Sequence, residues 1–94
     1  MIGTWGWSGE HCGPNNDGRL TVSAKAVAFA AATYDLQSMV QRQDGTVRAA
    51  AIVHEEGETG TTEAAIELKL RTANSLWIHT DALDHSYANC TKHP

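Results

Sequence analysis

Residues 79–85 hold the side chains with the greatest capacity for chemistry in the chain, with His79, Asp81, Asp84 and His85 in one short stretch. Imidazole and carboxylate groups together suit zinc and other divalent ions. On a strand, His79 and Asp81 would share one face, and Asp84 and His85 in a following turn could fold back toward them. His79, Asp81 and His85 are therefore a candidate metal set, although they match no recognised ligand spacing and an ordinary polar turn has the same composition.

Two other places hold residue types that serve in catalysis. Ser8 and His11 are of the types used as nucleophile and base, but no strand–turn–helix elbow with a Gly-x-Ser-x-Gly pattern surrounds them. Glu55 and Glu56 are adjacent carboxylates, which on an extended strand point to opposite faces and cannot share one cleft. We therefore expect a protein that is not an enzyme and needs no cofactor.

The aromatic residues are few and well spaced, and in a small domain they are most simply the core. The functional alternative concerns Trp7, Trp77 and Tyr87. Any one of these could line the mouth of a barrel and stack on an apolar or sugar ligand.

Composition indicates one globular domain, residues 1–94, since 41% of the residues are hydrophobic and 19% are charged. The net charge of −4 argues against a nucleic-acid partner, because binding phosphates needs clustered Lys and Arg. The basic residues are instead scattered along the sequence: Arg19, Lys25, Arg42, Arg48, Lys69, Arg71 and Lys92. The acidic balance weakly favours a basic partner. No apolar run approaches the roughly 20 residues of a membrane-spanning helix.

The two cysteines, Cys12 and Cys90, lie near opposite ends of the chain. They form no CxxC pair that would suggest zinc, and in a short chain such an arrangement favours one disulfide over two separate buried thiols. A disulfide implies an oxidising compartment, so we expect a periplasmic or secreted protein. The start, Met1-Ile2-Gly3-Thr4-Trp5, is typical of a strand and not of a signal peptide, which suggests a removed leader. The alternative is a cytosolic protein with its natural start.

Short segments separated by turn residues alternate with period two, the pattern of half-buried antiparallel strands. The clearest strand is 62–71, with Ala64, Ile66, Leu68 and Leu70 on one face and charged residues mainly on the other. A turn at Ala73-Asn74 leads into a strand over 76–80, so these two segments predict a hairpin. Further strands are expected at 3–7, 20–22, 46–54 and 86–91, with a loop over 10–18.

Residues 23–43 are the ambiguous region. Their alanines favour a helix, and Phe29, Leu36 and Val40 would fall on one helical face. A period-two pattern also fits, with Val27, Phe29 and Ala31 on one strand face. A helix here would make the protein α+β; strands would make it all-β.

Three features together carry a resemblance to a known group: Gly3-Thr4-Trp5 followed by Cys12, the run of short strands with Gly-containing turns, and Tyr87-Ala88-Asn89-Cys90 near the end. The chain resembles small exported bacterial proteins with the lipocalin-like barrel of the periplasmic C-type lysozyme inhibitors. The resemblance implies that Cys12 pairs with Cys90 and that 23–43 forms two strands. The second, inner cysteine pair of such proteins has no counterpart here, and their functional loop motifs have none either, so no inhibitory residue is carried over.

These observations together predict an all-β fold, a small antiparallel barrel or meander of about seven or eight strands with one disulfide. The expected function is binding, by a non-enzymatic exported module that is similar to the lysozyme inhibitors and recognises a basic protein such as a lysozyme. Its partner would meet the loops at 10–18, 55–61 or 81–85. The alternatives are a barrel with a small ligand inside it and a metal-binding protein that uses 79–85.

Overall fold

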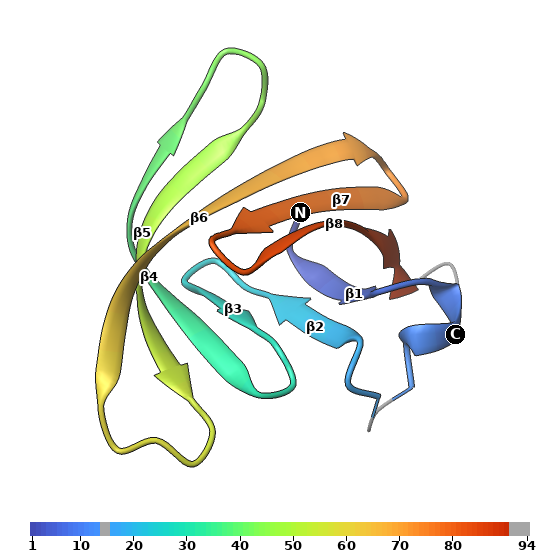
Figure 1. The fold of residues 1–94 in the computed structure, drawn as a ribbon. Helices are drawn as coiled ribbons and strands as arrows, with labels where there is room; N and C mark the ends of the chain where they lie inside the picture. The colour runs from blue at the N-terminus through green and yellow to red at the C-terminus, as the bar shows by residue number, and fades with distance from the viewer. Residues whose placement is uncertain (14–15, 91–94) are drawn as a thin grey trace.

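The computed structural model describes residues 1–13 and 16–90, and these residues form one closed antiparallel barrel with the strands in chain order. Each strand pairs with the next, and the first pairs with the last (Figure 1). The strands are β1 (Gly3–Gly6), β2 (Arg19–Val22), β3 (Ala26–Ala28), β4 (Ala32–Gln41), β5 (Val47–Glu55), β6 (Thr61–Thr72), β7 (Ser75–Thr80) and β8 (Leu83–Asn89). A short 3-10 helix, η1 (Gly9–His11), follows β1. The prediction of an all-β barrel is confirmed.

The helix considered for 23–43 is wrong, because β3 and β4 occupy that region. Val27 faces inward and is fully buried, whereas its neighbours Ala26 and Ala28 are only partly buried. Ala30 and Ala31 lie exposed in the turn between β3 and β4. The helical preference of alanine is thus overridden by strand pairing and by the burial of Val27, since propensity is a weak prior against tertiary packing.

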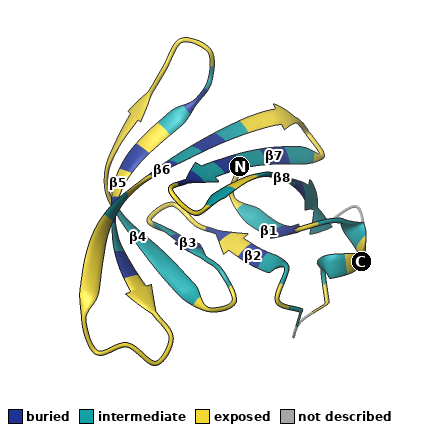
Figure 2. Cartoon of the chain, in the orientation of Figure 1, coloured by how far each residue is buried: buried dark blue, intermediate teal, exposed yellow. Residues whose placement is uncertain are grey.

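The barrel interior is filled by side chains, as expected of eight strands. Figure 2 shows the buried residues alternating with exposed ones along the strands. Ile66 and Leu68 are buried as the pattern of β6 predicts, but Leu70, the last residue of the series before the register shift in the pairing with β7, is 41% exposed. The central cluster comprises Trp5, Leu20, Val22, Val27, Ala49, Ala51, Ile66, Leu68, Leu76, Ile78 and Tyr87.

Two hairpins extend beyond the body of the barrel at opposite ends (Figure 1). One joins β4 to β5 through a turn that contains Gly45, which has a positive φ of 90°. The other joins β5 to β6 through a turn that contains Gly57, whose φ is 83°. Met39 and Val40, near the end of the first hairpin, are 54% and 66% exposed, because they lie past the filled interior.

A disulfide joins Cys12 to Cys90, 78 positions apart, as predicted. Cys90 directly follows β8, and Cys12 directly follows η1, so the bond lies next to the place where β1 meets β8. The predicted last strand, 86–91, begins earlier at Leu83, and its Thr91 lies outside the described residues. Within the described part of the chain, none of the helical segments has the length and apolar character that crossing a membrane requires.

Candidate functional site

The residues of the candidate metal set are not brought together. His79 pairs with Asp84 and His85 pairs with Ile78 across β7 and β8, so the two imidazoles point to opposite faces of the sheet. Asp81 is exposed in a two-residue turn, and Asp84 and His85 belong to β8, not to the turn in which they were expected. Among residues 1–13 and 16–90, no group of three His, Cys, Asp or Glu side chains could hold a metal ion.

Trp7 and Tyr87 do come together, at the end of the barrel near the disulfide. The Trp7 ring stacks on His85 with centroids 3.4 Å apart, and it meets the edge of Tyr87 at 5.8 Å. The Nε2 of His85 donates a hydrogen bond to the backbone oxygen of Trp7, 2.8 Å away. Trp7 is 44% exposed, whereas Tyr87 is buried, and burial raises the pKa of its phenol. This cluster packs Trp7, which directly follows β1, against two aromatic side chains of β8.

Trp77 lies elsewhere, on the outer face of β7. Its indole Nε1 donates to Oδ1 of Asp84 at 2.8 Å, and the His79 ring stacks parallel to it at 5.7 Å. The guanidinium of Arg71 lies 5.7 Å from the ring centre, a cation–π distance. The three aromatic residues considered as ligand contacts are therefore divided between an end of the barrel and its outer wall.

Ser8 and His11 are close, with Ser8 Oγ 2.7 Å from Nδ1 of His11. Ser8 is the N-cap of η1, and its Oγ also accepts from the amide of Glu10 at 3.3 Å. Capping is a sufficient structural reason for the contact with Glu10, and the single 3-10 turn brings His11, three residues after Ser8, next to it. Glu55 ends β5 and Glu56 begins the turn after it, both exposed to solvent.

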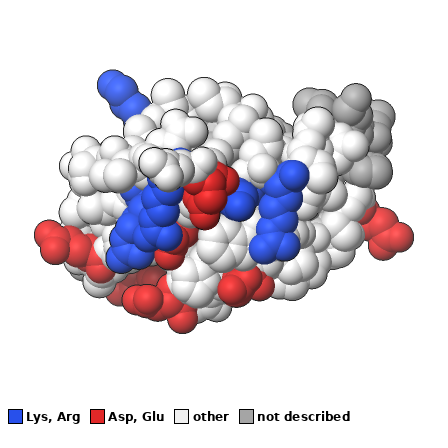
Figure 3. Space-filling view, turned by 90° about the horizontal axis from the view of Figure 1, so that it is seen from above, with Lys and Arg blue, Asp and Glu red and all other residues white. Residues whose placement is uncertain are grey.

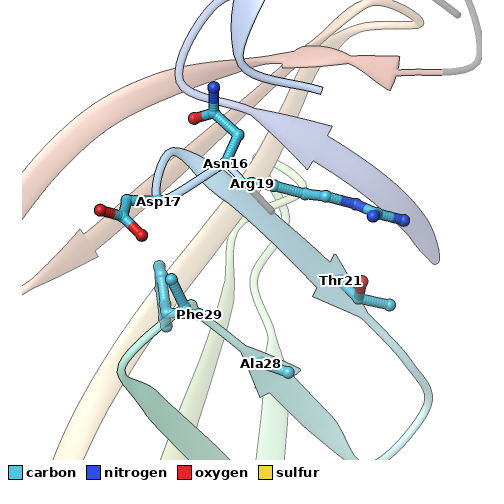
Figure 4. A pocket seen from close by; sticks show the side chains of 7 residues that line it. Asn16, Asp17, Arg19, Thr21, Ala28 and Phe29 are labelled. Atoms are coloured by element: carbon cyan, nitrogen blue, oxygen red, sulfur yellow. The ribbon is translucent and has the colours of Figure 1, made fainter. Parts of the chain in front are cut away.

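The loop before β2 borders a hollow of about 370 Å³ on the outer face of β2 and β3. Asn16 and Asp17 lie at its rim and Phe29 faces them across it (Figure 4). The Arg19 side chain runs along the sheet toward Thr21 and away from Asp17, so this acid and base do not form a pair (Figure 4).

The end of the barrel at the β5–β6 hairpin is acidic. Asp35 and Glu63 lie on either side of Ile52 in the sheet, and Glu55, Glu56 and Glu58 follow at the end of β5 and in its turn. No Lys or Arg occurs between Arg48 and Lys69 in the sequence. His54 Nε2 lies 2.6 Å from Oδ2 of Asp35, a pair that becomes ionic when the imidazole is protonated.

Two hollows flank Glu55 at this acidic end. One, of about 350 Å³, lies between the β3–β4 turn and the end of β5, with Phe29, His54, Glu55 and Glu56 in its lining. The amide of Glu56 donates to the oxygen of Ala31 at 2.8 Å and fixes the two walls. The other, of about 160 Å³, includes Glu55 and Glu58. Carboxylates beside a concave surface are suited to receive cationic side chains.

The opposite end gathers basic residues that are far apart in the sequence. Arg42 and Arg48 both contact Glu67, each at 3.4 Å, and Lys69 and Arg71 follow Glu67 along β6. Figure 3, which looks down on the end with the β4–β5 hairpin, shows basic and acidic side chains interleaved. The strand register places Arg48 opposite Glu67, Glu67 opposite His79, and His79 opposite Asp84, across β5 to β8. This register cannot be obtained from the spacing in the sequence.

Comparisons with protein-family models, with curated proteins and with solved structures found no match to this chain. Its function is therefore argued from the geometry of its surfaces.

Proposed function

We propose that the chain is a non-enzymatic exported module that binds a basic protein through its acidic end, with a C-type lysozyme as the first partner to test. The observation that carries the proposal is the collection of carboxylates around Glu55, beside two hollows and without a Lys or Arg between Arg48 and Lys69. Such a surface attracts a basic protein and speeds its encounter.

Two features of the barrel favour binding at this surface over binding inside it. The interior is occupied by the packed side chains of the core, including Leu20, Ile66 and Ile78, which are at most 1% exposed. The acidic residues lie on a projecting hairpin, where a partner can reach them (Figure 2). A disulfide also suits a protein that works in an oxidising compartment, where such a partner would be met.

The test is binding to a C-type lysozyme by isothermal titration calorimetry, together with inhibition of cell-wall lysis. We expect the triple variant E55Q/E56Q/E58Q to bind at least tenfold more weakly, because three carboxylates that face the partner lose their charge. Raising the salt concentration should weaken binding of the unmodified protein, since exposed charges are screened.

The matched control is E10Q/D44N/D81N, which also removes three exposed negative charges but from residues that line neither hollow at the acidic end. We expect it to bind within about twofold of the unmodified protein, since these charges lie outside both hollows and are screened. If both triple variants lose binding equally, the acidic end is not the interface. If the unmodified protein neither binds nor inhibits the lysozyme, the proposal fails for this partner class.

A further inference from the structure

A second concave surface lies on the wall of the barrel, away from the acidic end. It is a hollow of about 460 Å³ between the β4–β5 turn and the outer face of β6 and β7, lined by Asp44, Thr46, Lys69, Arg71 and Trp77. Lys69 and Trp77 are directly paired across β6 and β7, so the cation and the indole stand side by side. The proposed interface with a basic protein does not include any of these residues.

The indole in this hollow is held in place before any ligand arrives. Asp84 accepts the hydrogen bond of its Nε1 at 2.8 Å, and the parallel His79 ring packs beside it. Arg71 lies over the ring with its Cζ 5.7 Å from the ring centre, a cation–π contact that restrains the guanidinium at the hollow. A binding group with fixed orientation loses less entropy when it binds a ligand.

The charges in the hollow are two cations and one carboxylate. The neighbouring cations Arg42 and Arg48 contact Glu67, whereas Lys69 and Arg71 line the hollow itself. Asp44 accepts hydrogen bonds from the backbone and side chain of Thr46, which together with Lys69 and Arg42 lower its pKa. The Asp44 carboxylate is therefore charged at neutral pH and accepts hydrogen bonds only.

We propose that this hollow binds a hexuronic acid unit of an acidic glycan. Lys69 and Arg71 pair with the sugar carboxylate, Asp44 accepts hydrogen bonds from sugar hydroxyl groups, and Trp77 provides an apolar wall for the C–H groups of the ring. A neutral sugar leaves the two cations without a counter-charge. A nucleic-acid strand is disfavoured because Asp44, Glu67 and Asp84 interrupt the basic surface that a phosphate backbone requires.

The experiment is an NMR titration of the oxidised, full-length protein with digalacturonate, and with a neutral galactose disaccharide at the same ionic strength. Digalacturonate should shift the indole N–H of Trp77 and the amides of Lys69 and Arg71 in a saturable manner, whereas the neutral sugar should not. Equal binding of the neutral sugar, or the absence of saturable shifts at these residues, would overturn the proposal. Displacement of digalacturonate by an equal concentration of sulfate would show a general anion site and overturn it too.

Two single variants, R71Q and K69Q, test the assignment of the cations. Each should weaken digalacturonate binding at least tenfold, because each removes one positive charge and one donor group from the sugar carboxylate. The matched control is R42Q, which removes a cation of the same surface that contacts Glu67 and does not line the hollow. Both substituted side chains lie on the outer face of a strand, so we expect each variant to fold. A circular dichroism spectrum checks this. An equal loss in R42Q would reject the assigned hollow.

Discussion

Asp44 illustrates how a single exposed carboxylate can be tied to the fold by its local contacts. Its Oδ1 accepts the backbone amide of Thr46 at 2.9 Å, which closes the turn between β4 and β5. These hydrogen bonds, with smaller contributions from Lys69 and Arg42, lower its pKa below the ordinary value of 3.8. A carboxyl group whose pKa is lower in the folded state than in the unfolded state stabilises the fold at pH values above its unfolded-state pKa. This stabilisation disappears as the pH falls through its folded-state pKa.

The substitution D44N should therefore lower the melting temperature at about pH 6 but have little effect at about pH 2. Asparagine keeps the oxygen that accepts from Thr46, so the turn is preserved while the charge is lost. Thermal unfolding followed by circular dichroism across this pH range measures the difference. D81N, in the β7–β8 turn, is the control for losing one negative charge. A D44N effect that stays constant down to about pH 2 would contradict the explanation.

The residues of the candidate sites show what spacing alone can predict. Trp7 and Tyr87 lie together near the disulfide, each a few residues before one of its two cysteines. Trp77 lies apart from them, and its partners are Arg71 and Asp84. Those contacts depend on which residues of β6, β7 and β8 face each other, and this register is a property of the pairing and not of any one segment.

At the scale of elements, Gly6 shows why the chain can turn sharply between β1 and η1. A Cβ atom at this position would lie 2.7 Å from the backbone oxygen of Ser8 and 3.0 Å from the backbone of His11. Gly6 also pairs with Arg19 on one side and Ala88 on the other, so the strand cannot shift to make room. Only a residue without a side chain fits here.

Accordingly, G6A should reduce the free energy of unfolding by about 1–3 kcal/mol, the usual range for inserting atoms into a tightly packed place. Urea denaturation of the oxidised protein gives this value. The matched control is G60A, since a Cβ at Gly60 would have no atom within 4 Å. If G6A and G60A have equal stability, the backbone around Ser8 and His11 can move, and the explanation is wrong.

Most strands were predictable because the apolar residues alternate, as in β6, or because turn residues mark the ends, as at Ala73-Asn74. The region 23–43 was not predictable from its own residues, because its alanines fit a helix as well as a strand. The distinction comes from pairing between strands, in which Val27 faces Val22 and Tyr34, and Tyr34 in turn faces Val53 of β5. The start of β8 was missed for a related reason, since Leu83 pairs with Thr80 across a turn of only two residues.

At the scale of the whole molecule, the disulfide should account for a large share of the stability. A link between residues 78 positions apart restricts the unfolded chain strongly, and the chain-entropy model gives about 4–5 kcal/mol for a loop of this length. A small domain has a total stability of roughly 5–15 kcal/mol. Reduction should therefore leave a folded state of low stability.

Urea denaturation with and without dithiothreitol, compared with the double variant C12S/C90S, measures this contribution. We expect the reduced protein and the variant to unfold at similar urea concentrations, both well below that of the oxidised protein. The variant is the control for effects of the reductant itself. A loss of less than about 1 kcal/mol would mean that the sheet closes without help from the covalent link.

The pairing of β1 with β8 has a consequence for the behaviour of the reduced chain in concentrated solution. In the described residues this seam consists of two residue pairs, Trp5 with Asn89 and Gly6 with Ala88, and the covalent link lies beside it. If the seam opens, β1 and β8 become free edges whose amide and carbonyl groups can pair with the same strands of another copy. The bond between Cys12 and Cys90 thus keeps each chain from joining its neighbours in swapped dimers or aggregates.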